Sequence, residues 1–134
     1  MPEEIMTTNE APREIAATAL AFDTATRAGK IKLFNALNSA ESLNDSNVQQ
    51  LTLQGIIVQS GTRVDQATGE VSPAEFTTFI TEDTAYFSQS DGIARSAKNL
   101  IAAFGDDFAD EPITIVFATK KLQGGRSLKY FYVL

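Results

Sequence analysis

The sequence predicts a small, mainly β domain in which one helix precedes the last two strands. Short runs rich in β-branched and aromatic residues recur between residues 29 and 134. Turns rich in glycine and polar residues separate these runs. Residues 91–104 instead repeat apolar side chains at helical spacing. The length of 134 residues fits a single domain with one hydrophobic core.

The first 21 residues are expected to form an acidic arm that is partly disordered or folded as a short helix. Residues 1–26 carry five acidic residues and one basic residue, a net charge of −4. Pro12 would lie in the first turn of the helix, where a missing N–H costs little. The apolar side of the helix could pack on its own domain or on a neighbour. Ile15 and Leu20 are the predicted contacts for self-association.

Residues 22–134 are expected to form the domain, which opens with a strand at 29–35. Apolar and polar side chains alternate there, so Lys30, Lys32 and Phe34 would share one strand face. The remaining elements follow from turn residues, alternation and helical spacing. They are a polar loop at 38–47, a strand at 48–60 that bends at Gly55, a hairpin loop at 61–73, strands at 75–81 and 84–88, a helix at 91–104 that begins after Ser90, and strands at 112–119 and 127–134.

This order of strands, with the helix between the third and fourth, is that of an OB-fold. We therefore predict a five-stranded Greek-key barrel, although other small barrels share the same coarse pattern. OB-folds bind oligonucleotides through strands 2 and 3 and through the loops 1–2 and 4–5.

The composition leaves little material for catalysis. The chain has no cysteine and no histidine, which excludes thiolate chemistry and the usual general base near neutral pH. Four acidic residues cluster at 106–111, but they lie in a predicted loop and are interpreted as solvated. Gly124 and Gly125 could cradle a phosphate, yet the spacing and lysine of a P-loop are missing. We predict a protein without enzymatic activity, cofactor or metal, and keep a nucleotide-using enzyme as the weakest hypothesis.

The net charge of −6 argues at first against a nucleic-acid partner, but the charge is uneven. Residues 27–40 and 112–134 contain basic residues and no acidic residue. Proteins that bind single strands combine a cationic groove with aromatic side chains on which bases stack. Candidates for both roles lie in or near these two segments. The predicted DNA contacts are Arg27, Lys30, Lys32, Phe34, Arg63, Tyr86, Lys120, Lys121, Arg126, Lys129, Tyr130 and Tyr132.

Residues 22–36, FDTATRAGKIKLFNA, resemble the opening of the single-stranded DNA-binding proteins of small Bacillus phages with protein-primed replication. The order of the later elements is similar as well, up to residue 134. A similar OB-fold family occurs on conjugative plasmids of Gram-positive bacteria. The resemblance implies a protein that coats and protects single-stranded DNA, largely without sequence preference, during replication or conjugative transfer.

Two further expectations concern location and partners. The N-terminus lacks a basic region followed by an apolar one, and no apolar run is long enough for a membrane helix. We therefore expect a cytoplasmic protein without membrane contact, which associates with itself along DNA through its arm. The competing hypothesis is an OB-fold module whose acidic surface recruits a protein partner and never contacts DNA.

Overall fold

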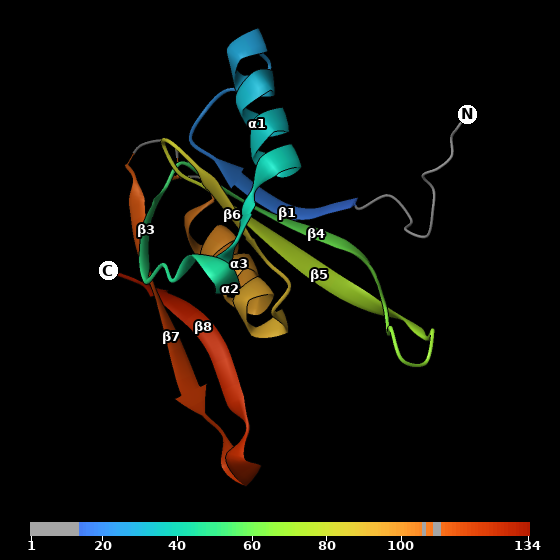
Figure 1. Cartoon of the computed structure of the whole chain (residues 1–134). Helices are drawn as coiled ribbons and strands as arrows, with labels where there is room; N and C mark the ends of the chain where they lie inside the picture. The colour runs from blue at the N-terminus through green and yellow to red at the C-terminus, as the bar shows by residue number, and fades with distance from the viewer. Residues whose placement is uncertain (1–13, 106, 109–110) are drawn as a thin grey trace, which may run out of the picture.

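The computed structural model describes residues 14–105, 107–108 and 111–134. These residues form a mainly β structure in which two sheets enclose a helix (Figure 1). The elements, in chain order, are β1 Glu14–Leu20, α1 Arg27–Ser39, β2 Glu41–Ser42, α2 Leu43–Ser46, β3 Gln50–Leu53, β4 Gly55–Val64, β5 Val71–Ile80, β6 Ala85–Ser88, α3 Asp91–Phe104, β7 Ile113–Lys121, a 3-10 turn Gln123–Gly125, and β8 Ser127–Val133.

The larger sheet has the strand order β1-β4-β5-β6-β2, and the smaller one has the order β3-β7-β8. Helix α3 lies between them and contacts β1, β4, β5 and β8. Among the described residues no hydrogen-bonded pair of strands joins the two sheets, so they do not close into the predicted five-stranded barrel. The mainly β class and the helix before the last two strands are confirmed, whereas barrel closure is not.

The predicted strand at 48–60 is in fact two strands in different sheets, β3 and β4. They separate at Gln54. The N–H of Gln54 donates to Ile80 O at 2.7 Å, and its carbonyl accepts from the N–H of Ala21 at 2.8 Å. Gly55 follows directly, and a side chain there would come within 2.7 Å of Leu20 Cδ2. The predicted bend at Gly55 is thus the point at which the chain changes sheets.

The predicted helix in the arm is wrong over the described residues, because Glu14–Leu20 forms strand β1. Its residues pair antiparallel with β4, from Glu14 opposite Ser60 to Leu20 opposite Gly55. Alanine favours helices, but pairing along the open edge of β4 prevails over this local preference. Residues 1–13, which include Pro12 and most of the predicted arm, lie outside the described part of the chain.

The predicted strand at 29–35 is also wrong, since these residues belong to helix α1. The side chain of Thr26 caps the helix by accepting a hydrogen bond from the N–H of Gly29 at 3.0 Å. Leu33 and Ala36 then pack against Ile57 of β4, in a small cluster beneath the helix. The alternation of lysines with apolar residues is therefore not that of a strand.

Other elements agree more closely with the sequence prediction. The loop expected at 38–47 contains the short elements β2 and α2. The hairpin loop is only 65–70, where Asp65 Oδ1 accepts hydrogen bonds from the N–H groups of Ala67 and Thr68. Gly69 turns the chain with φ of +76°. Strands β5 to β8 and helix α3 lie where predicted, within a few residues at their ends.

Helix α3 is capped and seated as its sequence predicts. The hydroxyl of Ser90 accepts a hydrogen bond from the N–H of Ile93 at 3.3 Å. Gly92, in the first turn, touches the backbone of β8. An added Cβ there would collide with Lys129 O and lie 2.7 Å from Leu128 Cδ1. Only glycine therefore lets the helix approach β8 so closely.

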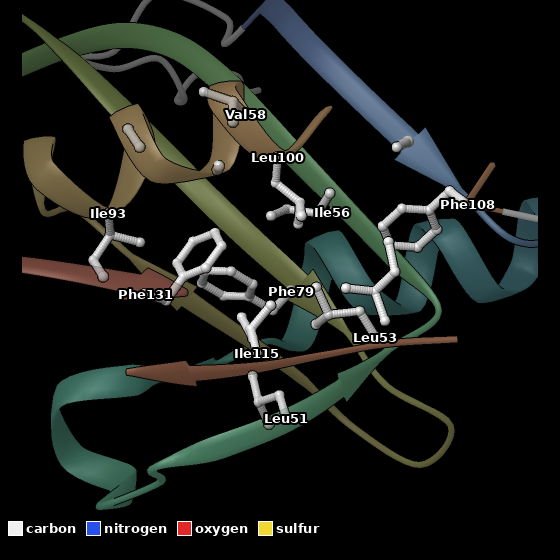
Figure 2. Packing of buried hydrophobic residues seen from close by; sticks show 14 residues of the cluster. Leu51, Leu53, Ile56, Val58, Phe79, Ile93, Leu100, Phe108, Ile115 and Phe131 are labelled. Carbon is white, nitrogen blue, oxygen red and sulfur yellow. The ribbon is translucent and has the colours of Figure 1, made fainter. Parts of the chain in front are cut away.

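The main core fills the space between the two sheets and α3 (Figure 2). Phe79 of the larger sheet meets Phe117 and Phe131 of the smaller one, with ring centroids 5.4 and 5.6 Å apart. The rings pack edge to face, the arrangement that aromatic pairs favour. These three side chains connect the sheets without any shared strand.

Candidate functional site

The last strand decides which side chains the smaller sheet presents to solvent. Phe131 of β8 is buried in the main core. Because successive side chains alternate across a strand, Tyr130 and Tyr132 lie on the opposite face. Tyr132 is 49% exposed and Tyr130 is half-buried. Alternation alone does not show which face of β8 is exposed. Because Phe131 is buried, Tyr130 and Tyr132 are on the exposed face.

The register extends this face across all three strands. Tyr132 lies opposite Val116, and Tyr130 lies opposite Ala118. Val116 in turn lies opposite Gln50 of β3. We call this surface the outer sheet face, and it contains no acidic residue. It consists of Gln50, Thr52, Thr114, Val116, Ala118, Lys120, Tyr130 and Tyr132.

The outer sheet face has dimensions that suit bases. Residues two apart on a strand are separated by about 6.8 Å, which is the expected spacing of Tyr130 and Tyr132 along β8. Stacked bases are separated by about 3.4 Å. The two tyrosines therefore lie on the same face of β8, about two base-stacking distances apart along the strand. Nearby, the hydroxyls of Thr52 and Thr114 hydrogen-bond to each other at 3.0 Å.

A basic hairpin extends from one end of this face. Gly124 and Gly125 have φ of +81° and +79°, and the N–H of Leu122 donates to Arg126 O at 2.8 Å to close the turn. Lys120, Lys121 and Arg126 are exposed beside the turn. Within the described residues none of these three cations has an ion pair or a hydrogen-bonded side chain. They are free to meet phosphates.

Lys129 does not belong to the same surface, although it was predicted with it. It lies on the inner side of β8, in register with Thr119. Its Nζ donates to Asn44 Oδ1 at 3.1 Å, which ties β8 to α2. We therefore interpret Lys129 as a structural contact at the edge of the basic hairpin.

The basic residues of α1 lie far from the hairpin. Figure 1 shows α1 and the turn between β7 and β8 at opposite ends of the molecule. Arg27, Lys30 and Phe34 are exposed there. Lys32 instead leans inward, with its Nζ 3.5 Å from both Thr81 O and Glu82 O. The two basic segments that the sequence singled out are thus not brought together.

Arg63 and Tyr86 also lie away from the outer sheet face. Arg63 Nη2 donates to Gln89 O at 2.8 Å near the end of β4. Tyr86 is half-buried and lines a groove of about 680 Å³. Glu82, Asp83 and Glu111 also line this groove, and carboxylates repel phosphates. Tyr86 is therefore a poor candidate for a DNA contact.

Both predicted self-association residues belong to β1. Ile15 is 53% exposed, and Leu20 packs against the small cluster beneath α1. The sequence missed Gln50, Thr52 and Val116 as members of the outer sheet face. Their alternation with buried neighbours was a usable signal, but the pairing of β3 with β7 was not readable from it.

Two negative findings concern the described residues only. No group of three or more acidic side chains there is placed to hold a metal ion. Asp106 and Asp110 lie outside this part, so the interpretation of their loop stays a prediction. None of the described helices is long and apolar enough to cross a membrane.

A family model described as phage single-stranded DNA-binding protein, of the Phi29 type, matches residues 11–130. The match includes β1, α1, the basic hairpin and the outer sheet face except Tyr132. No curated protein and no solved structure matches the chain. The resemblance to plasmid proteins therefore stays a prediction.

Proposed function

The chain belongs to the Phi29 family of phage single-stranded DNA-binding proteins, and from this premise we propose that it binds single-stranded DNA without catalysing a reaction. One structural observation supports the proposal. Two tyrosines lie side by side on an acid-free sheet face that leads into a hairpin with three unpaired cations. This combination of stacking rings and cations is typical of proteins that bind single strands.

In this proposal, bases stack on Tyr130 and Tyr132, while Lys120, Lys121 and Arg126 neutralise phosphates. Every base has a flat face, so stacking tolerates any sequence. A paired base is already stacked within its duplex and cannot reach the rings. The protein therefore binds the unpaired state and opposes re-pairing by mass action.

We further propose that the protein coats and protects single strands during phage replication. Conjugative transfer would need the same chemistry, because it also exposes single strands. An OB-type arrangement of the strands fits this role, although the described sheets stay open. Arg27, Lys30, Lys32, Phe34, Arg63 and Tyr86 stay predicted DNA contacts, but they lie outside the surface on which this proposal rests.

The test is a titration of the full chain with labelled oligo(dT), followed by anisotropy at several salt concentrations. We expect affinity to fall with salt at about −0.7 log units per log unit for each phosphate contact. Replacing Lys120, Lys121 and Arg126 with alanine should weaken binding several-fold and flatten this slope. The matched control replaces Arg27, Lys30 and Arg95, three exposed cations elsewhere, and should change affinity far less.

The opposite results have clear meanings. Equal losses in both triple variants would show that only total charge matters and would reject the hairpin as the site. No binding of oligo(dT) at low salt would reject the function and favour a module that recruits a protein partner.

A further inference from the structure

The edge of β3 that faces away from β7 has no strand beside it among the described residues. In an antiparallel pair, successive residues direct their backbone groups to alternate sides of the strand. The N–H of Phe117 donates to Gln49 O at 2.9 Å, so the odd-numbered residues of β3 bond to β7. The backbone N–H and C=O groups of Gln50 and Thr52 therefore point the other way, and we call them the free edge of β3.

Gln54 shows the same direction independently. Its backbone groups lie next in the row formed by those of Gln50 and Thr52, and they bond to Ile80 O and to the N–H of Ala21. Both partners flank the larger sheet, on the side opposite β7. In the part of the chain that the structure describes, this row is thus occupied at Gln54 and open at Thr52 and Gln50.

A groove provides space beside the free edge of β3. This is the groove of about 680 Å³ that Tyr86 lines, and residues 50–54 and 81–84 also border it. Leu51 and Leu53 turn from β3 toward the core, where Figure 2 shows them. The apolar lining of the groove comprises Phe22, Leu51, Leu53, Tyr86, Phe108 and Pro112.

The sequence of β3 does not protect this edge. Lysine, proline or a bulge keeps many natural strand edges from pairing with another chain. The four residues Gln50–Leu53 are uncharged, contain no proline and pair with β7 without a break in register. Such an edge can accept an extended segment, whose backbone hydrogen bonds provide affinity while its side chains provide specificity.

The charge of the groove favours a basic partner. Glu82, Asp83 and Glu111 line it and are exposed, whereas none of its described lining residues is a lysine or an arginine. Among the described residues, none of these three carboxylates has an ion pair. Opposite charges across an interface favour the correct partner and speed its association.

Lys32 shows that a cation is stable beside this groove. Its Nζ lies 3.5 Å from both Thr81 O and Glu82 O, and 5.7 Å from the centroid of the Phe22 ring. An ammonium group over an aromatic ring is attracted by the negative face of the ring. Phe22, Thr81 and Glu82 also line the groove, so the same surroundings suit a cation from a partner.

We propose that an extended segment of another protein, in which basic and apolar residues alternate, binds in this groove as an added strand beside β3. Its backbone bonds to the N–H and C=O groups of Gln50 and Thr52. Side chains alternate across a strand, so its apolar side chains enter the groove while its basic ones meet the exposed carboxylates. The contact requires neither DNA nor the tyrosines of the outer sheet face.

The first test is a titration of the full chain, without DNA, into a fluorescent peptide of alternating lysine and valine. We expect the anisotropy of the peptide to rise as it binds. A peptide of alternating glutamate and valine should bind far more weakly, because its charge is wrong. The lysine peptide with every backbone nitrogen methylated should also bind far more weakly, because it keeps the charge but cannot donate to β3. Equal binding of the methylated peptide would overturn the proposal, as would no binding of the lysine peptide.

Matched variants locate the contact. The triple change Glu82→Gln, Asp83→Asn and Glu111→Gln should weaken binding of the lysine peptide several-fold. The control, Glu14→Gln, Asp45→Asn and Glu70→Gln, removes the same charge from exposed residues outside the groove and should change affinity far less. Circular dichroism should show that both variants are folded. Equal losses would mean that only net charge attracts the peptide and would reject the groove.

Hydrogen exchange of single backbone amides tests the added strand directly. The N–H groups of Gln50 and Thr52 should exchange quickly in the free chain and slowly with the lysine peptide. Those of Leu51 and Leu53 should be slow in both, because they bond to β7. Peptide binding without slower exchange at Gln50 and Thr52 would overturn the proposal. Exchange that slows as the chain is concentrated without peptide would identify a second copy as the occupant and would overturn it too.

The outcome can be separated from that of the proposed function. The variant without the three groove carboxylates should still bind oligo(dT), because the hairpin cations and both tyrosines are intact. Binding of the lysine peptide by a chain that does not bind oligo(dT) would reject the proposed function and support this contact. Binding of oligo(dT) without binding of the peptide would reject this contact alone.

Discussion

Two basic segments of similar charge form different kinds of surface at opposite ends of the molecule. Residues 27–40 and 112–134 are both basic and free of acids; the first contains one aromatic residue, Phe34, and the second contains four. The first forms a helix, around which Phe34 and its neighbours wind. The second forms a sheet, on which Tyr130 and Tyr132 lie in one row. Charge and composition indicate which segments form a candidate binding surface. The side-chain repeat, about 3.6 residues in a helix and two in a strand, decides how the side chains are arranged on that surface.

The two ends also differ in what supports them. The outer sheet face is backed by a core of fourteen buried residues. The helix α1 rests on a cluster of only four. A face that must hold two rings in register benefits from a stiff backing, because stacking depends on their relative placement.

The largest expected effect tests this difference in support. Phe79→Ala removes the ring that joins the two sheets and should lower the free energy of unfolding by about 3–5 kcal/mol. Leu33→Ala beneath α1 is the matched truncation in the small cluster. Because Leu33 is only half-buried, its loss should be smaller, about 1–2 kcal/mol. Urea unfolding followed by circular dichroism measures both, and equal losses would contradict the comparison.

The next effect tests which end binds bases. Tyr132→Ala should weaken binding of a short oligo(dT) by about 5- to 150-fold, since stacking contributes about 1–3 kcal/mol per base. Tyr132→Phe keeps the ring and should retain most of the affinity. Phe34→Ala is the control at the other end, and its affinity should stay within about twofold of the unmodified chain. A larger loss for Phe34→Ala than for Tyr132→Ala would move the DNA path to α1.

The smallest effect tests the inner side of the larger sheet. The hydroxyl of Thr77 is fully buried and has no hydrogen-bond partner among the described residues. Thr77→Val keeps the shape and removes the unsatisfied group, so it should stabilise the fold by about 1 kcal/mol. Thermal unfolding measures the change, and oligo(dT) affinity should not alter because Thr77 lies far from the outer sheet face. A destabilised variant would show that the hydroxyl has a partner, such as a buried water.

The elements that sequence patterns predicted correctly are those whose local signals agree with their packing. Helix α3 has a serine cap and apolar residues at helical spacing, and the same residues fill the core. Strands β7 and β8 flank a glycine turn and place Ile113, Ile115 and Phe131 in the core. In these regions the residues close in sequence and the tertiary contacts favour the same structure.

The elements that were mispredicted depend on partners distant in sequence. Residues 14–20 form a strand because β4 offers an edge, not because their alanines favour one. In α1, Ile31 and Phe34 face solvent and blur the helical pattern, while Thr26, outside the alternating run, starts the helix. No local pattern contained the pairing of β1, whereas the cap of α1 was a local signal, since Thr26 and Gly29 are only three residues apart.

The candidate site was predicted in part for the same reason. The sequence marked the hairpin cations and both tyrosines on β8 as candidates. It could not choose the exposed face, since that choice depends on Phe131 meeting Phe79. It also grouped α1 with the hairpin, because charge along a chain does not report distance in space.

The close contact of Gly92 with β8 offers a way to detect binding at the outer sheet face. The first turn of α3 touches the carbonyl of Lys129, and the next residue along β8 is Tyr130. A ligand on the tyrosines would thus lie next to the stretch of backbone that Gly92 touches. The amide of Gly92, isotopically labelled, is a natural spectroscopic reporter. We expect its chemical shift to respond to oligo(dT), although no nucleotide would contact it.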